Sequence, residues 1–404
     1  MTRHWIMLLL AAGAASPAFA QGTPAPASHR FTGAPRIGSS DGWSLKPRGR
    51  LQYDVGDISR PAGVTVAGLG TADEIRRGQL GVEGTIPGGF SYLFEVEFAE
   101  HITEITEATL TWSASPHVAV TAGQHNGFQS LEELTSDRFT SFMERAAFTD
   151  AFNFNRRVGV SATVTQGPVT GQFGVFSDNL LEIDEADGAW SVDGRIVYAP
   201  RIGATQLHIG ASAHWRDAGD RVSRGITTRY RQRPFIHTSD VRFIGTSALP
   251  VDAETALGLE AAMIKGPFHA TGELHWLHAD GAGTAADPTL FGGYAEIGWF
   301  LTGETRGYRG ARWDRTRVRH PIEDGGLGAV QALLRYDYLD LNSGNVRGGR
   351  QGGIEAALVW LPTDYVRLTV NYARLSYDEA VVPAAGGDRS YGVDAYGMRV
   401  AVDF

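Results

Sequence analysis

The chain has 404 residues, 10% of them aromatic, and contains no cysteine, so it has neither a disulfide framework nor thiolate chemistry. Its formal net charge is −9, from 36 basic and 45 acidic residues, which argues against a nucleic-acid partner.

The N-terminus has the pattern of a secretory signal peptide. A basic start precedes an apolar run over 5–15, and the small-residue pattern Ala18-Phe19-Ala20 follows. The alternative is a membrane anchor, but the run is shorter than the roughly 20 residues that a spanning helix needs. We therefore expect an exported protein with three parts: a signal peptide over 1–20, a flexible lead-in over 21–46 and a single domain over 47–404.

Apolar and polar residues alternate with a period of two along the rest of the chain. At the C-terminus, Tyr396, Met398 and Val400 alternate with Gly397 and Arg399. Successive side chains of a strand face opposite sides, so each strand has one apolar and one polar face. Such stripes fit either a soluble β-sandwich with a buried apolar face, or a membrane barrel with its apolar face toward lipid.

Segment length and loop length favour the barrel. The segments have about 9–13 residues, close to the roughly 9–11 that a tilted strand needs to cross a bilayer. Aromatic residues recur at segment ends, and tight turns alternate with long links. The sequence predicts an all-β fold, a 16-stranded antiparallel transmembrane β-barrel with these strands: 48–57, 76–86, 90–99, 105–113, 117–125, 155–165, 168–178, 189–199, 204–216, 253–265, 267–279, 290–303, 326–339, 351–362, 365–377 and 391–404.

An even strand number places both termini on the periplasmic side, together with every tight turn. The link over 304–325 is then the one long connection on that side. The terminal Phe404, at the end of an alternating aromatic strand, resembles the assembly signal of outer-membrane barrels. We therefore expect a protein of the bacterial outer membrane in contact with lipid and lipopolysaccharide.

Several segments resemble the phosphate-selective porin O and P family. The clearest are Gly123-Gln124, the run over 130–136 and Phe142-Met143-Glu144-Arg145. Further similar segments are Arg233-Pro234, Gly245-Thr246, Glu260, Gly266-Pro267-Phe268, Glu273 and the run over 300–308. The resemblance implies an inward-folded constriction loop, a homotrimer, and passive diffusion of small anions, phosphate or polyphosphate.

The sequence departs from the family at one position of that loop. The family usually has a lysine, then Pro-Phe, after Gly-Gln, whereas this chain has Asn126, Phe128 and Gln129. A general or organic-solute porin without phosphate selectivity is therefore the alternative function.

Arginines in the link over 304–325 are the first candidates for an anion pathway. Their planar, permanently charged donors match phosphate and carboxylate geometry. If the link folds into the mouth of the barrel, it makes an electropositive funnel; otherwise it is a solvated surface loop. The residues are Arg306, Arg309, Arg312, Arg315, Arg317 and Arg319.

A second arginine cluster lies in the long link over 217–252, on the outer side of the predicted barrel. It either gathers anions at the outer mouth or contacts acidic groups of lipopolysaccharide. The residues are Arg221, Arg224, Arg229, Arg231, Arg233 and Arg242.

The predicted inward loop over 126–154 supplies the third set of candidates. Ser130 and Glu133 have capping-box spacing, which predicts a short helical turn. Arg138 is expected to contact the solute, while Glu144 and Arg145 are expected to hold the loop against the barrel wall. Arginines of the strands are expected to continue a basic track along the lumen: Arg195, Arg216, Arg335, Arg367 and Arg399.

The sequence gives little support to an enzyme. It has no nucleophile elbow, no His-Glu-x-x-His motif and no phosphate-binding loop. His208 and His214 share a strand face but lie six residues apart, too far for one metal ion at about 3.3 Å per residue. We expect no enzyme activity, no cofactor and no metal. A barrel enzyme and a secreted β-sandwich binding protein are the alternatives from other classes.

Overall fold

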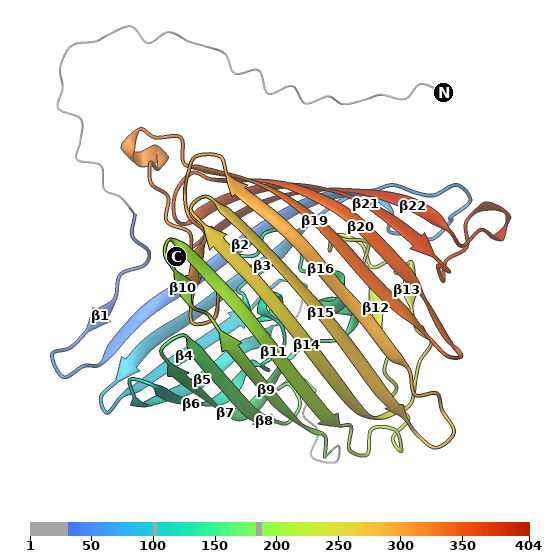
Figure 1. Cartoon of the computed structure of the whole chain (residues 1–404), viewed down its shortest axis with the longest axis horizontal. Helices are drawn as coiled ribbons and strands as arrows, with labels where there is room; N and C mark the ends of the chain where they lie inside the picture. The colour runs from blue at the N-terminus through green and yellow to red at the C-terminus, as the bar shows by residue number, and fades with distance from the viewer. Residues whose placement is uncertain (1–30, 100–102, 183–187) are drawn as a thin grey trace, which may run out of the picture.

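The computed structural model describes residues 31–99, 103–182 and 188–404. The predicted signal peptide over 1–20, and the lead-in as far as residue 30, lie outside the described residues. Figure 1 shows one barrel of tilted strands around a central lumen.

Sixteen antiparallel strands in the described part of the chain close this barrel, as the sequence predicts. Each strand pairs with its neighbour in the chain, and β22 pairs with β2 to complete the ring. The strands are β2 (Ser44–Ile58), β3 (Gly70–Ile86), β4 (Phe90–Glu97), β5 (Glu104–Ser115), β6 (Val118–Asn126), β7 (Arg156–Gln166), β8 (Val169–Phe176), β9 (Trp190–Tyr198), β11 (Thr205–Asp217), β14 (Val251–Lys265), β15 (Phe268–Gly281), β16 (Thr289–Phe300), β19 (Ala329–Ser343), β20 (Val346–Leu361), β21 (Val366–Asp378) and β22 (Tyr391–Asp403).

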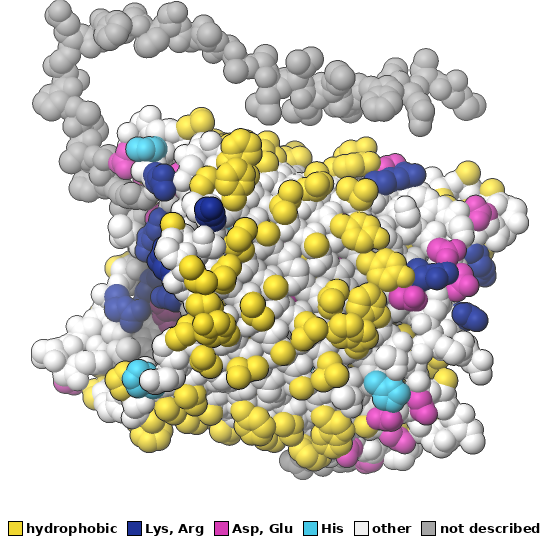
Figure 2. Space-filling view, in the orientation of Figure 1, with side chains coloured by type: hydrophobic (Ala, Val, Ile, Leu, Met, Phe, Trp, Pro, Cys, Tyr) yellow, Lys and Arg dark blue, Asp and Glu magenta, His cyan; other side chains and the backbone are white. Residues whose placement is uncertain are grey.

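The alternation of the sequence sorts side chains between the outside and the lumen. On β14, Leu257 and Leu259 are more than half exposed on the outer face, whereas Glu254 and Glu260 are buried inside. Figure 2 shows apolar side chains over the outer face, with charged side chains gathered at the two ends of the strands. Among the described residues, no helix combines the length and apolar character needed to cross a membrane.

Two connections depart from a simple pattern of short turns and long loops. The expected long link on the tight-turn side is present, over 301–328. On the opposite side, β19 and β20 extend beyond their predicted ends to a tight turn at Gly344, whose φ is 55°. A register shift between Asp340 and Asn342 lets the two strands keep pairing up to that turn.

Three connections fold into the barrel. The constriction loop (127–155) carries α1 (Leu131–Leu134) and α2 (Ala147–Ala151), and the outer loop (218–250) carries β12 (Arg231–Gln232) and β13 (Ile244–Gly245). The periplasmic link (301–328) carries β17 (Gly307–Arg309), β18 (Arg312–Asp314) and η1 (Ile322–Asp324). The remaining short elements are β1 (Ile37–Gly38), β10 (Arg201–Ile202) and η2 (Ala385–Gly387).

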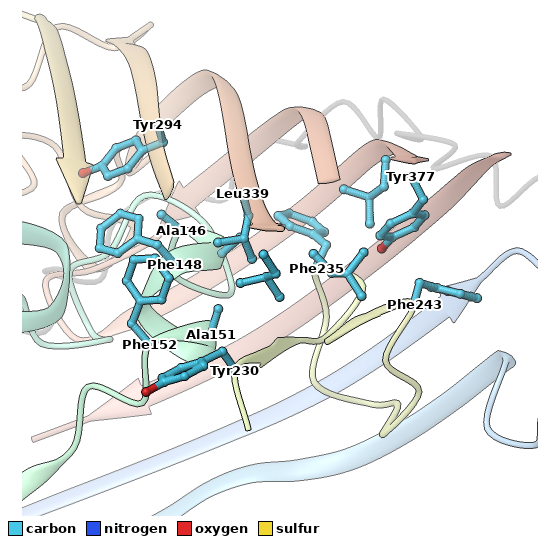
Figure 3. Close-up of a cluster of buried hydrophobic side chains, with 14 of the residues drawn as sticks. Ala146, Phe148, Ala151, Phe152, Tyr230, Phe235, Phe243, Tyr294, Leu339 and Tyr377 are labelled. Atoms are coloured by element: carbon cyan, nitrogen blue, oxygen red, sulfur yellow. The ribbon is translucent and has the colours of Figure 1, made fainter. Parts of the chain in front are cut away.

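The largest apolar core lies between these inward loops and one wall of the barrel. Phe148 of α2, Phe152 directly after it and Phe235 of the outer loop belong to one buried cluster with Tyr294 and Leu339 of the wall (Figure 3). Buried apolar area of this kind stabilises the loops against the wall. The inward loops therefore fill the part of the lumen next to β15–β22, and the unfilled part of the lumen lies along the opposite wall.

Candidate channel lumen and constriction

The first helical turn of the constriction loop is fixed by hydrogen bonds at its start. The Ser130 hydroxyl accepts a hydrogen bond from the Glu133 backbone N–H at 3.2 Å, which confirms the predicted cap. The backbone N–H groups of Leu131 and Glu132 donate to the Glu273 carboxylate of β15 at 2.9 and 2.7 Å. These contacts tie α1 to the barrel wall.

Arg335 of β19 joins the loop to the wall through a fully buried ion cluster. Its guanidinium donates to Glu132 of the loop and to Glu296 of β16, both at 2.8 Å. It also lies over the rings of Phe142 and Tyr294, at 4.4 and 4.6 Å from their centres. Arg335, predicted to face the lumen, therefore lies under the constriction loop rather than in open water.

The second half of the loop is held at Glu144. Its carboxylate accepts from Arg76 of β3 at 3.1 Å and from Arg399 of β22 at 2.8 Å. Burial opposes ionisation of Glu144, but the charges of Arg76 and Arg399 outweigh it and hold the pKa well below its ordinary value. The next residue, Arg145, donates to the backbone carbonyls of Glu132 and Thr135 within the loop.

A β-bulge turns two consecutive arginines toward the lumen. In the β2–β3 ladder the register shifts between Gln52 and Tyr53, so Arg76 has no opposite residue. Arg76 and Arg77 therefore both reach the constriction loop, at Glu144 and Asp137. A strict period of two would have placed one of them in lipid. The sequence signal for the bulge is the Arg-Arg pair itself, which breaks the alternation of apolar and polar residues.

The six predicted arginines of the periplasmic link lie in three different environments. Arg306 is buried and donates to Ser141 of the constriction loop at 2.7 Å and to Glu296 at 3.0 Å. Arg315 forms an ion pair with Asp403 of β22. Arg309 and Arg312 flank a hairpin tip inside the barrel, whereas Arg317 and Arg319 are exposed.

The hairpin tip is pinned across the lumen. Gly310 and Ala311 both have positive φ angles, 59° and 57°, as a two-residue hairpin turn requires. Arg195 of β9 donates to the Ala311 carbonyl at 2.9 Å. Trp313 behind the tip is buried against Leu131 of α1. The link thus supports the constriction loop from the periplasmic side and presents Arg309 and Arg312 to water.

The outer-loop arginines lie at the opposite end of the lumen. Arg221 pairs with Asp178 at 3.4 Å, and Arg233 pairs with Asp150 of the constriction loop at 3.6 Å. Arg224 is exposed, and Arg229 and Arg231 line a cavity of about 300 Å³. These positions are at the outer mouth of the barrel.

Three water-accessible cavities lie along the open side of the lumen. The inner cavity, of about 390 Å³, lies between the constriction loop and the periplasmic hairpin. The β3-side cavity, of about 370 Å³, and the β11-side cavity, of about 300 Å³, lie on the outer side of the constriction loop. Arg156 of β7 lines all three.

Arginines outnumber carboxylates in the lining of each cavity. The inner cavity has Arg48, Arg50, Arg138, Arg145, Arg156, Arg309 and Arg312 against Glu95, Glu107, Asp137 and Asp314. The β3-side cavity has Arg76, Arg77, Arg145, Arg156 and Arg233 against Glu133, Glu144 and Asp150. The β11-side cavity has Arg156, Arg157, Arg216, Arg221, Arg229 and Arg231 against Glu182 and Glu254.

Two of these arginines show how crowded the positive charge is. Arg138, predicted to contact the solute, lies 3.6 Å from Asp403, and burial together with Arg50 and Arg48 lowers its pKa to about 10. It therefore stays charged at neutral pH. The Arg312 side chain has no ion pair or hydrogen bond within the described part of the chain, so no close partner holds its guanidinium at the inner cavity.

Several lumen arginines were missed by the sequence analysis. Arg48 and Arg50 of β2, and Arg156 and Arg157 of β7, line the cavities together with Arg76 and Arg77. Arg48 and Arg50 have the spacing of one strand face, a signal that was available. The described residues contain no group of three His, Asp or Glu side chains placed to hold a metal ion.

The chain is similar to known porins in sequence and in structure. A family model described as phosphate-selective porin O and P matches residues 45–404. An uncharacterized protein of Caulobacter vibrioides is 47% identical over 399 residues, covering 96% of this chain and 80% of that protein. Porin O of Pseudomonas aeruginosa is 26% identical over 375 residues, covering 83% of this chain and 84% of that protein.

Among solved structures, an anion-selective porin from Comamonas acidovorans matches with a TM-score of 0.57 at 14% identity. The match covers 90% of this chain and 100% of that porin, and it supports the same barrel fold. Together with the closed barrel and its water-lined lumen, the family match leads to one conclusion: the chain belongs to the phosphate-selective porin O and P family and is a porin of the bacterial outer membrane.

Proposed function

We propose that this porin prefers small anions, with phosphate or polyphosphate as its solute. The observation that carries the proposal is the excess of arginine over carboxylate in all three lumen cavities. The whole chain has a net charge of −9, so the positive lumen does not follow from overall composition. Charged side chains that line a narrow pore set its ion selectivity.

The low-dielectric barrel wall strengthens this effect. A cleft lined by one sign of charge focuses the field and raises the local concentration of the opposite ion. Arginine also offers planar donors that match phosphate oxygens in pairs. The family description and the Porin O relative support phosphate as the solute, and the Comamonas acidovorans porin supports anion preference more broadly.

A general porin without phosphate selectivity is the second candidate, and Asn126 is the observation in its favour. This position carries lysine in the family but here holds an amide, which donates to the Glu133 carbonyl at 3.3 Å. Arg145 and Arg156 supply positive charge in the cavity next to it. Either candidate is a channel, which the family and the fold favour over an enzyme.

Three further features follow from the family and the sequence and remain proposals. We expect a homotrimer, as the family resemblance implies, and removal of residues 1–20 during export. The outer-mouth arginines Arg221, Arg224, Arg229, Arg231 and Arg233 gather anions or contact phosphates of lipopolysaccharide.

Current recordings in planar bilayers under a salt gradient test the proposed selectivity. The reversal potential should report anion preference, and Arg312→Glu should weaken it because Arg312 faces the inner cavity without an ion pair. The matched control, Arg350→Glu, changes an arginine of the outer rim, paired with Asp378, and should leave selectivity unchanged.

Phosphate added to a chloride solution distinguishes the two candidates. A reduced chloride current supports phosphate as the solute. Anion preference without any effect of phosphate supports the general porin. Cation preference in the unmodified protein would refute the proposal as a whole.

A further inference from the structure

We propose that the outer lumen is split into two parallel ion routes that merge at Arg156, which makes Arg156 the residue that sets selectivity for both. The routes are the β11-side cavity and the β3-side cavity, and the shared path is the inner cavity. This inference requires a conducting lumen but not the proposed phosphate preference.

The partition between the two outer cavities is made by contact between two inward loops. The Asn153 side chain of the constriction loop donates to the Arg229 carbonyl of the outer loop at 3.3 Å. The Arg233 backbone N–H donates to the Asp150 carboxylate at 3.3 Å, and its guanidinium lies 3.6 Å from the same carboxylate. Asn153 also lines both outer cavities, so the chain at this point separates them.

The partition is backed by a packed core rather than by a free loop. Phe148 of α2 stacks on His275 of β15, with 4.3 Å between ring centres, and has no exposed surface. The Ala147 N–H donates to Asp337 of β19 at 2.9 Å. Figure 3 shows the rings of Phe148 and Phe152 grouped beside Tyr294 of the wall. The dividing segment is therefore anchored on both of its sides.

Each route has its own cations, which do not line the other. Arg216, Arg221 and Arg231 line the β11-side cavity, whereas Arg76, Arg77 and Arg233 line the β3-side cavity. The two cavities have comparable volumes, about 300 and 370 Å³. An anion can therefore enter on either side of the partition.

Arg156 stands where the routes meet. It is the first residue of β7, lines all three cavities, and its nearest carboxylate, Glu107, is 3.8 Å away. Its side chain is one-third exposed, so its charge faces water. Ions from either route must pass this guanidinium before they reach the inner cavity.

Thiol modification tests the two routes directly, because the protein has no cysteine of its own. Thr227→Cys places a thiol in the β11-side cavity, and His237→Cys places one in the β3-side cavity. A bulky sulfonate-bearing methanethiosulfonate reagent at either thiol should leave about half of the single-pore current, since the cavities are similar in size. The double variant should lose nearly all of it.

Two further variants locate the shared path. Ser136→Cys lies in the inner cavity, and its modification alone should block nearly all current. Val160→Cys, on the lipid face of the same strand as Arg156, is the matched control and should show no block. Mass spectrometry establishes that each thiol has reacted.

Arg156→Gln completes the test. It should reduce anion preference in the unblocked pore and equally after either outer route is blocked. The proposal is overturned if modification of one outer thiol removes all current or none. It is also overturned if Arg156→Gln changes selectivity only while one particular route is open.

Discussion

Replacing Arg335 by methionine should release the constriction loop without unfolding the barrel. The substitution removes the ion-pair partner of the fully buried Glu132 and one of the two arginines that hold Glu296. It also removes the cation that lies over the rings of Phe142 and Tyr294. Breaking one side of a buried ion pair costs about 3–5 kcal/mol. The sixteen strands keep their hydrogen bonds, so the cost falls on the contact between loop and wall.

Trypsin measures how often the loop leaves the wall. Arg138 and Arg145 lie in the loop, and because their side chains are only 16% and 21% exposed, we expect trypsin to reach them only when the loop leaves the wall. A loss of about 3–5 kcal/mol raises the open population by roughly two to three and a half orders of magnitude, at 1.4 kcal/mol per tenfold. Nicking within the loop should accelerate by this factor while the barrel remains folded in detergent, and the open-channel current should become noisy.

Two controls separate this effect from general damage. Arg350→Met breaks an exposed pair with Asp378, worth about 0–1 kcal/mol, and should leave nicking unchanged. Adding Glu132→Gln to the Arg335 variant removes the carboxylate that has lost its ion-pair partner, while Glu296 keeps Arg306, and should restore much of the protection. Equal protection in the Arg335 and Arg350 variants would refute the assignment of Arg335 as the anchor.

Two further predictions concern pH and assembly. Since Arg76 and Arg399 depress the pKa of Glu144, its contribution to loop stability is present above the unfolded pKa of about 4.3 and is lost only as the pH falls through the depressed value. Channel recordings should therefore show no loosening of the constriction loop between neutral pH and about pH 5. At lower pH the loop should loosen, and Glu144→Gln should remove this acid effect. Loosening near pH 6 that is absent in Glu144→Gln would contradict the prediction. Gly123→Ala should lower the yield of folded barrel, because φ at Gly123 is 120° and a methyl group there would meet a backbone carbonyl of the neighbouring strand. Gly171→Ala is the control and should fold normally, because the space around its Cβ is open. Equal yields of the two variants would contradict the prediction.

The strands could be predicted because their signal is local. Lipid on one side and water on the other impose the period of two on each strand separately, as on Tyr396, Met398 and Val400 of β22. Strand order and barrel closure could then be predicted, because strands that follow one another in the chain pair antiparallel and an even number of strands places both termini on the same side. The bulge that turns Arg76 inward was missed because register depends on the partner strand, whose alignment the β3 sequence alone does not contain.

The candidate site was predicted only in outline. The family resemblance located the inward loop, and the spacing of Ser130 and Glu133, a short-range pattern, predicted the cap of its first helical turn. The sequence predicted a single role for the arginines of the periplasmic link, whereas Arg306 is held by Glu296 and by Ser141 of the constriction loop, and Arg315 is held by Asp403 of β22. Arg312 forms no ion pair with any residue in the described part of the chain. A side chain's role in the pore depends on which distant residues pack against it.

The sequence by itself determined that this chain is a sixteen-stranded barrel, since the alternation of apolar and polar residues is a property of short segments. Only the tertiary structure decided which arginines bind structural carboxylates and which line open water. The physical reason is distance along the chain: Arg335 and Glu132, which together set the position of the constriction, are 203 residues apart and meet only when the barrel closes.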